Sequence, residues 1–247
     1  MKSGRRSGDF VKQLVKRKSI ERRKSLKQYL RRLVRPAWLG TIRRTSPVSD
    51  HYGRDRGTPI DRFYIERFLE EHQQEIHGRV LEVKDRAYVD RYGTNVEHCD
   101  VLDIDPANSK ATIVADLSAA ESISADRFDC FVLTQTLQFI YNLRGAIIHC
   151  HRILRPQGVL LVTVPAVGRI FPNDTINPDY WRFTASSCLA LFAEVFGPEH
   201  VTVQTYGNVL TEIAFLTGLA CEELSRHELD ANDENFPVVV SVRAVKR

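Results

Sequence analysis

The sequence predicts an α/β fold built on a doubly wound parallel sheet and preceded by a basic arm. From Arg79 onwards, short apolar runs alternate with stretches of helical periodicity, the pattern of a parallel sheet covered by helices on both faces. The charges are divided just as clearly. Residues 1–44 hold 16 Lys and Arg against 2 acids, a net charge of +14, whereas residues 45–247 hold 19 against 29, a net charge of −10.

The chain is predicted to consist of a basic N-terminal arm (1–44, partly helical or disordered), a linker (45–57) and a folded domain (58–247). In the arm, apolar residues recur at helical spacing with Lys and Arg on the other faces: Phe10, Leu14, Leu26, Leu30, Leu33 and Val34. Such a basic amphipathic segment binds an anionic membrane surface or a polyanion, or docks on the acidic body of its own chain. These alternatives stay open at this point.

The folded domain is expected to begin with a helix that has Thr58 as its N-cap and Pro59 at its first position, and that ends near Gly78. Short apolar runs predict seven strands: 79–83, 101–104, 111–115, 128–133, 158–164, 201–206 and 238–245. Further helices are expected at 143–154, 184–196 and 209–224. Residues 155–158 are expected to end the preceding helix, before the fifth strand. Thr184 and Gly197 are expected to cap the helix between them.

The composition argues against several classes of protein. The longest strongly apolar run, Val159–Val164, is much shorter than the roughly 18–20 residues of a transmembrane helix, and the N-terminus is too charged for the apolar part of a secretory signal. The 5 cysteines include no CxxC pair and the histidines show no ligand spacing, so no metal is expected. A reducing, cytoplasmic location is expected, with a membrane-peripheral one as the alternative.

Acids stand at the ends of three successive predicted strands: Glu82 in the first, Asp103 and Asp105 at the second, and Asp116 after the third. In a doubly wound sheet, ligands bind beyond the carboxyl ends of the strands, beside the first one. Carboxylates accept hydrogen bonds from ribose hydroxyls and from an adenine amino group. The three acids together favour such a ligand, although each alone could cap the following helix. Asp105 is preferred to Asp103 because it stands last.

Several segments resemble a known family: Val80–Val83 (VLEV), Val101–Asp105 (VLDID), Ala115–Asp116, Phe128–Asp129 and Arg152–Gly158 (RILRPQG). Their order resembles the class I S-adenosylmethionine-dependent methyltransferases of the type 11-like group. Longer segments are similar to a bacterial subgroup: Arg56–Glu66, Leu133–Leu143 and Asp179–Thr184. The resemblance covers about residues 47–247. It implies a Rossmann-like sheet of seven mostly parallel strands, with an antiparallel last strand between strands five and six.

The resemblance also implies S-adenosylmethionine as the cofactor. Glu82 and its neighbours would border the methionine part, Asp105 or Asp103 would hold the ribose hydroxyls, and Asp116 with Leu117 would flank the adenine. The predicted cofactor-binding residues are Glu82, Lys84, Asp103, Asp105, Asp116, Leu117 and Gln135.

Two positions depart from the family pattern, which has glycine at both. The loop after the first strand contains no glycine until Gly93, and Lys84 stands where the subgroup commonly has one. The lysine side chain either pairs with the cofactor carboxylate or obstructs the pocket. Gln157 replaces a glycine away from the ligand, and a structural effect alone is expected there.

The expected reaction is methyl transfer to a small-molecule or glycan-type acceptor at oxygen, for which the protein positions the acceptor and removes its proton. The acceptor site is expected in the segment 166–183, after the fifth strand. Its candidate substrate contacts are Tyr180, Trp181 and Arg182, and Asp179 is a candidate base. In the alternative interpretation, the two aromatic residues form a lid over the core and Arg182 forms an ion pair. A saccharide acceptor is suggested by the subgroup alone.

Two other classes of function are kept as alternatives. One is a binding or scaffold protein whose cofactor loop has degenerated, and the other is an RNA-directed methyltransferase guided by the basic arm. A nicotinamide-dependent dehydrogenase is a poorer candidate, because no GxGxxG follows the first strand and no Tyr-x-x-x-Lys motif suits its catalysis.

Overall fold

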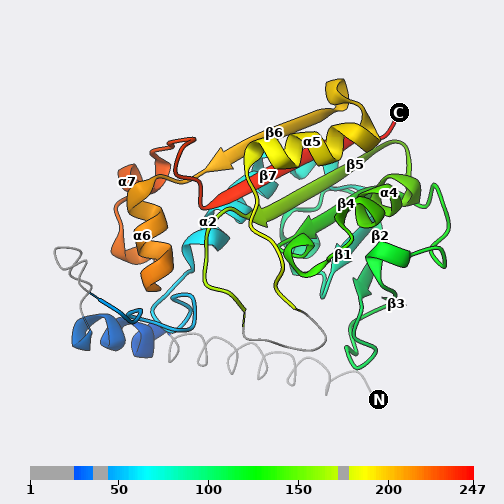
Figure 1. The fold of residues 1–247 in the computed structure, drawn as a ribbon. Helices are drawn as coiled ribbons and strands as arrows, with labels where there is room; N and C mark the ends of the chain where they lie inside the picture. Colours follow the sequence, from blue (N-terminus) through cyan, green and yellow to red (C-terminus); the bar gives the residue numbers. More distant parts are fainter. Residues whose placement is uncertain (1–24, 36–43, 172–177) are drawn as a thin grey trace, which may run out of the picture. The chain divides into compact units, whose positions relative to one another are not determined.

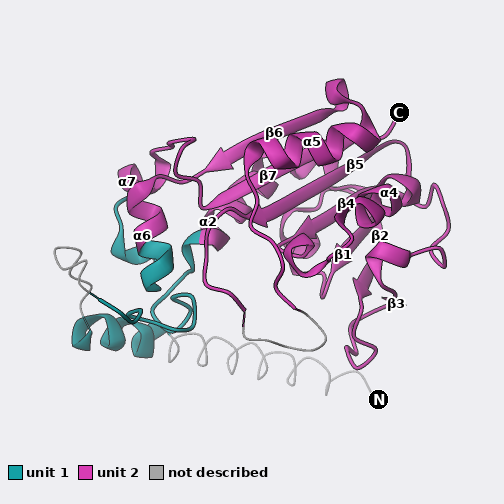
Figure 2. Cartoon of the chain, viewed as in Figure 1, with its two compact units in different colours: residues 1–60, 214–225 teal, residues 61–213, 226–247 magenta. Residues whose placement is uncertain are grey.

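The computed structural model describes residues 25–35, 44–171 and 178–247 (Figure 1). Phe10 and Leu14 of the predicted amphipathic pattern lie outside the described residues. Two compact units make up the chain (Figure 2): residues 1–60 with 214–225 form the smaller unit, and residues 61–213 with 226–247 form the larger one. The predicted linker 45–57 thus belongs to the smaller unit, which also includes a segment from the predicted domain.

The larger unit contains a seven-stranded sheet in the order β3-β2-β1-β4-β5-β7-β6. Its strands are β1 (Gly78–Val83), β2 (Val96–Asp103), β3 (Ile113–Val114), β4 (Phe128–Thr134), β5 (Leu154–Pro165), β6 (Val201–Tyr206) and β7 (Val239–Val245). All pairs from β3 to β5 are parallel, and β7 runs antiparallel to both β5 and β6. The predicted fold class is confirmed, including the antiparallel last strand between strands five and six.

Two strands begin earlier than the sequence predicts. β2 starts at Val96 and pairs with β1 along its whole length. β5 starts at Leu154, so the predicted break at residues 155–158 lies inside a strand. A shift in register makes this possible, because Phe128 pairs with Leu154 whereas Cys130 pairs with Val159. The extra residues form an irregularity in which the backbone N–H of Gln157 donates to the Lys246 carbonyl at 2.7 Å.

Besides a helix at residues 25–34, the described residues form six α-helices: α2 (Ile60–Glu71), α3 (Ala87–Tyr92), α4 (Leu143–Ile153), α5 (Ala185–Phe196), α6 (Val209–Thr217) and α7 (Arg226–Asp230). α5 has the predicted caps, with Thr184 in a capping box and Gly197 at φ +87°. Thr58 instead directs its backbone N–H and hydroxyl to the Glu222 carboxylate, and α2 begins two residues later. α3 and α7 are additional short helices.

The predicted helix 209–224 is shorter in the structure, and Gly218 explains why. Gly218 follows α6 with φ +74°, and a Cβ atom there would lie 2.1 Å from the Ser49 carbonyl oxygen. Only glycine fits this close approach, and it ends the helix. A separate 3-10 turn (Cys221–Glu223) follows.

The sheet of the larger unit is buried on both faces. Leu160 and Leu161 are neighbours on β5, so their side chains point to opposite faces, and both are fully buried. One face forms the main apolar cluster with α4 and α5, which lie in front of the sheet in Figure 1. All five cysteines are buried and have free thiols. Among the described residues, no helix has the length and apolar character needed to cross a bilayer.

Lys84 (φ +68°) and Gln157 (φ +66°) are among the exposed residues that adopt the left-handed backbone conformation. A residue with a Cβ atom loses roughly 1–2 kcal/mol there. The family resemblance of the sequence implies glycine at both positions. The backbone conformation gives a physical reason for glycine at these positions, independent of any ligand.

We therefore expect Lys84→Gly to be more stable than Lys84→Ala by about 0.5–1 kcal/mol. Glycine relieves the strain of the left-handed conformation, but part of this gain is offset because glycine loses more conformational entropy on folding. The same difference is expected between Gln157→Gly and Gln157→Ala. Urea denaturation of the four variants measures the free energies of unfolding. Ser186, exposed in α5, is the control, and there glycine should be the less stable residue. Glycine variants no more stable than the alanine variants at Lys84 and Gln157 would contradict the strain.

Candidate functional site

The strand order places a switch point at β1. β1 lies between β2 and β4, and the order reverses there, since β2 and β3 lie on one side and β4 and β5 on the other. In open α/β sheets, ligands bind at this switch point beyond the carboxyl ends of the strands. The residues that follow β1, β2, β4 and β5 therefore form the candidate site.

Glu82, near the end of β1, is buried with 1% of its surface exposed. Its carboxylate oxygens accept hydrogen bonds from the backbone N–H groups of Tyr88 (3.1 Å) and Val89 (2.8 Å), in the first turn of α3. Burial raises the pKa of Glu82 to about 7, against the opposing effect of these hydrogen bonds. The carboxylate thus connects the end of β1 to α3 and fixes the loop between them.

Lys84 forms the turn directly after β1. Its backbone N–H donates to the Leu102 carbonyl at 3.0 Å, and its own carbonyl accepts from Asn108 Nδ2 at 2.8 Å. The side chain is exposed. The left-handed turn therefore lies against the end of β2.

The two candidate acids after β2 have different surroundings. Asp103 is the last residue of β2, and its carboxylate accepts from the Asp105 N–H at 3.0 Å and from Asn108 Nδ2 at 2.7 Å. Asp105 lies beyond the strand and accepts from the Ala107 N–H at 2.8 Å. Because Asn108 also binds the Lys84 carbonyl, Asp103 is held beside the β1 turn. The reason for preferring Asp105, its place at the strand end, applies in the structure to Asp103.

The residues after β3 and β4 differ in their solvent exposure and in their hydrogen-bond partners. Asp116 is exposed and accepts from the backbone N–H and hydroxyl of Ser118, both at 2.8 Å, whereas Leu117 packs in the main apolar cluster. Gln135 follows β4 at φ +46°, and its N–H donates to the Thr163 carbonyl at 2.8 Å. Its side-chain Nε2 is buried and has no hydrogen-bond partner in the part of the chain that the structure describes. It is a buried donor that a ligand could satisfy.

The segment after β5 lies against the connection between β4 and α4. The Tyr180 N–H donates to the Gln138 carbonyl at 2.8 Å, and Trp181 Nε1 donates to the Ile140 carbonyl at 3.0 Å. The exposed Tyr141 ring lies 5.3 Å from that of Tyr180 and 5.9 Å from that of Trp181, between ring centroids. These three side chains form an aromatic cluster at the carboxyl edge of the sheet. Residues 172–177 of the predicted acceptor segment lie outside the described residues.

Asp179 anchors this segment. Its carboxylate binds the Arg182 guanidinium through Nη1 (2.6 Å) and Nη2 (2.8 Å), and accepts from the Phe171 N–H at 2.8 Å. Burial raises the pKa of Asp179, but the hydrogen bonds from Arg182 and Phe171 outweigh it and lower the pKa overall. Arg182 also donates to the Arg169 carbonyl at 2.9 Å. A carboxylate held in this way is a weak base. The side chains of Asp179 and Arg182 join the two ends of the segment, because they bind the backbone of Phe171 and Arg169.

The structure thus brings Lys84 and Asp103 together through Asn108, and it brings Tyr180 and Trp181 together around Tyr141. Sequence reasoning missed both connecting residues. Asn108 had a signal, because a Pro-x-Asn sequence after a strand is typical of a turn with side-chain hydrogen bonds. Tyr141 lies within a segment that carried the family resemblance, but nothing local indicated its partners. No group of three or more metal-ligating side chains occurs within the described parts of the chain.

Comparisons with known proteins agree with this architecture. Residues 83–162 match a family model described as a methyltransferase domain. No curated protein sequence matches the chain. Among solved structures, phosphoethanolamine N-methyltransferase 2 of Haemonchus contortus in complex with S-adenosyl-L-methionine is similar, at 14% identity and a TM-score of 0.50 over 85% of this chain and 55% of that chain.

Two further structures are similar at slightly lower scores. A SAM-dependent methyltransferase of Archaeoglobus fulgidus is 12% identical, with a TM-score of 0.49 over 75% of this chain and 94% of that chain. The 1,6-didemethyltoxoflavin-N1-methyltransferase of Burkholderia thailandensis, with S-adenosylhomocysteine bound, is 16% identical, with a TM-score of 0.47 over 74% of this chain and 76% of that chain. The domain match supports a methyltransferase enzyme. At identities below 25%, the solved structures show a similarity of fold alone.

Proposed function

We propose that this protein transfers a methyl group from S-adenosylmethionine to an oxygen of a small-molecule or glycan-type acceptor. The observation that carries the proposal is the convergence at the carboxyl edge of the sheet. The left-handed turn after β1, a carboxylate at the end of β2 and a buried amide donor after β4 all lie at the switch point.

The chemistry of these residues fits the parts of S-adenosylmethionine. The carboxylates accept from ribose hydroxyls, the buried Gln135 amide supplies a donor that lacks a partner in the described structure, and the exposed Lys84 ammonium suits a carboxylate. When bound, the cofactor supplies a methyl group on a positively charged sulfur. The protein's part would be to hold the two reactants in line, and the proton released from the acceptor oxygen would pass to solvent water.

Asp103 is proposed as the ribose-binding acid in place of Asp105. It ends β2, and the bonds from Asn108 and from the Asp105 N–H fix its orientation beside the β1 turn. Each carboxylate oxygen keeps capacity for a second hydrogen bond. Asp105, in contrast, begins the turn that leads to Ala107. Glu82 is proposed to fix the loop between β1 and α3 through its hydrogen bonds to the start of α3. Asp116 and Leu117 are proposed to border the adenine.

The proposal predicts that Asp103→Ala weakens S-adenosylhomocysteine binding at least about tenfold, the loss of a charge-assisted hydrogen bond of about 1.4 kcal/mol. Asp105→Ala, the matched control two residues away, should change the affinity less than about threefold by the same scale. Isothermal titration calorimetry of the full chain measures both. Loss of binding in Asp105→Ala alone would restore the first assignment. Absence of heat with the folded wild-type protein would favour a binding or scaffold role.

The acceptor is proposed to lie against the aromatic cluster of Tyr141, Tyr180 and Trp181. Tyr141 and Tyr180 are 71% and 47% exposed, so their faces are available to stack on a polar ring such as a sugar. Asp179 and Arg182 are proposed to position this segment, because their bidentate pairing takes up the carboxylate. Asp179 is accordingly proposed as an anchor of the segment and not as a base.

We expect Tyr180→Ala to lower methyl transfer at least about tenfold, whereas Tyr180→Phe keeps the stacking face and most of the activity. The assay follows formation of S-adenosylhomocysteine with a panel of monosaccharides and nucleotide sugars, and calorimetry checks that cofactor affinity is unchanged. Transfer to bulk RNA that falls steeply with salt, with none to the sugars, would support the RNA-directed alternative instead. Equal activity in both Tyr180 variants would remove the aromatic cluster from the acceptor site.

A further inference from the structure

The smaller unit carries a helix at residues 25–34 whose apolar side chains are exposed. One face of this helix is formed by Leu26, Tyr29, Leu30, Leu33 and Val34, at exposures from 49% for Leu30 to 78% for Val34. Five large apolar side chains therefore form a continuous stripe that is accessible over ten residues of helix.

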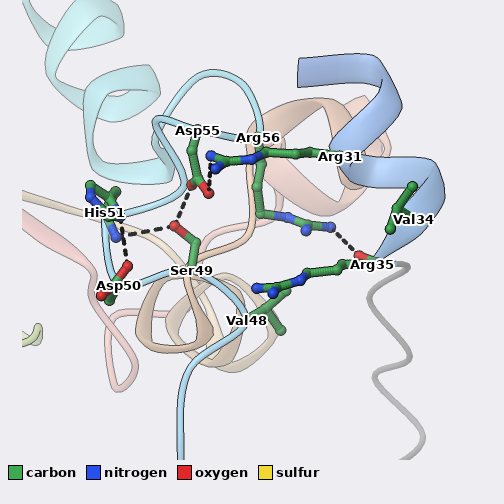
Figure 3. A pocket seen from close by; sticks show the side chains of 9 residues that line it. All are labelled: Arg31, Val34, Arg35, Val48, Ser49, Asp50, His51, Asp55 and Arg56. Carbon is green, nitrogen blue, oxygen red and sulfur yellow. Dashed lines mark hydrogen bonds and ion pairs between the residues drawn. The ribbon is translucent and has the colours of Figure 1, made fainter. Parts of the chain in front are cut away.

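The polar side of the same helix is the side that holds it in place. Gln28 Nε2 donates to the Arg54 carbonyl at 3.1 Å, and Arg32 Nη1 donates to the Arg56 carbonyl at 2.6 Å. Arg31 forms an ion pair with Asp55 at 2.8 Å. The Arg31 pair and the bond from Arg56 to the Arg35 carbonyl are visible in Figure 3. The helix is anchored to the segment 48–56 through its polar side chains.

The segment that receives the helix is itself well fixed. Arg56 is 1% exposed and forms a bidentate ion pair with Glu223, with Nε 2.9 Å from Oε2. Ser49 and Arg31 both bind Asp55. A cavity of about 320 Å³ lies between the helix and this segment (Figure 3). Carboxylates pair with two of the three arginines that line it, Arg31 and Arg56, so the cavity is not a strong site for an anion.

This orientation is the reverse of the usual one, in which an amphipathic helix buries its apolar face and exposes its polar face. We propose that the helix 25–34 docks on an anionic membrane surface, with its apolar stripe inserted at the boundary between headgroups and acyl chains. The proposal concerns the smaller unit only and does not depend on the proposed methyl transfer.

The basic charge of this helix favours a lipid surface as its binding partner. The described helix and its end carry Lys27, Arg31, Arg32 and Arg35 and no acid, within an arm of net charge +14. Basic residues beside an apolar stripe are the signature of helices that lie in the plane of an anionic interface. The basic side chains along the same helix would be costly in the core of a bilayer, so the described part of the helix lies on the membrane surface. A nucleic acid would use the cationic side and leave the leucines exposed.

The test is co-sedimentation of the full chain with vesicles of phosphatidylcholine and phosphatidylglycerol in equal parts, and with phosphatidylcholine alone. Wild type is expected to bind the anionic vesicles and to lose most of this binding on the neutral ones. Leu30→Glu/Leu33→Glu should reduce the partition coefficient at least about tenfold, because two side chains can no longer enter the apolar layer.

The matched control is Ile148→Glu/Leu189→Glu, which changes two helical side chains of similar exposure (43% and 45%) in the larger unit. This variant should bind vesicles as wild type does. Circular dichroism confirms that both variants are folded. A wild type that does not bind anionic vesicles overturns the proposal, as does a Leu30→Glu/Leu33→Glu variant that binds as well as wild type. Binding of wild type to polyuridylate in place of vesicles would assign the arm to nucleic acid.

A second variant reports on the inserted face directly. Leu33→Trp places an indole in the apolar stripe, and its fluorescence should shift to shorter wavelength on addition of anionic vesicles, after subtraction of the wild-type spectrum. Gln28→Trp, on the polar side, should show no such shift. A shift in Gln28→Trp without one in Leu33→Trp would mean that the opposite face meets the lipid.

Discussion

A buried carboxylate at the end of the first strand organises the carboxyl edge of the sheet. Glu82 is inaccessible to solvent, and the N–H groups at the start of α3 bind both of its oxygens. Burial of this charge is unfavourable, which places its pKa at about 7, so the two hydrogen bonds are what make the position tolerable. They hold the loop 84–86 in one conformation. The left-handed Lys84, and through Asn108 the carboxylate of Asp103, are arranged around that loop.

An ion pair holds the chain segment on the other side of the switch point. Asp179 and Arg182 fix the segment after β5, and backbone hydrogen bonds from Tyr180 and Trp181 join it to the connection after β4. Both sides belong to the larger unit and follow the carboxyl ends of parallel strands. A cofactor at the β1–β4 switch point and an acceptor at the aromatic cluster would therefore share one edge of the sheet. This common edge is what the proposed in-line transfer requires.

The sequence predicted the strands that consist of apolar runs, and the fold class with them. It missed the start of β2 because Asp100 looks unlike a buried strand residue, yet Thr112 and Arg127 bind its carboxylate and it is 4% exposed. It missed α3 because six residues without a local cap give no periodic signal, and the cap is Glu82 from the preceding strand. Both errors have one physical cause, a carboxylate whose partners are distant in sequence.

In the candidate site, too, features set by the strand order were predictable, and features set by contacts between distant residues were not. Acids at strand ends pointed to the carboxyl edge of the sheet, since topology alone brings those ends together. The choice between Asp103 and Asp105 depended on where β2 ends, and a pattern of period two does not settle that. The aromatic cluster needed the return of the chain after β5 to Tyr141, a contact that spans about forty residues and leaves no local signature.

Hydrogen–deuterium exchange of the full chain, with and without S-adenosylhomocysteine, tests the central claim most directly, because it locates the ligand without assuming a residue. The account predicts slower amide exchange in the segments 83–92, 103–108 and 134–142, at the ends of β1, β2 and β4. It predicts no change in the segments 25–35 and 44–56 of the smaller unit. Protection confined to the segments 25–35 and 44–56, or no protection at the ends of β1, β2 and β4, would contradict a cofactor site at the switch point.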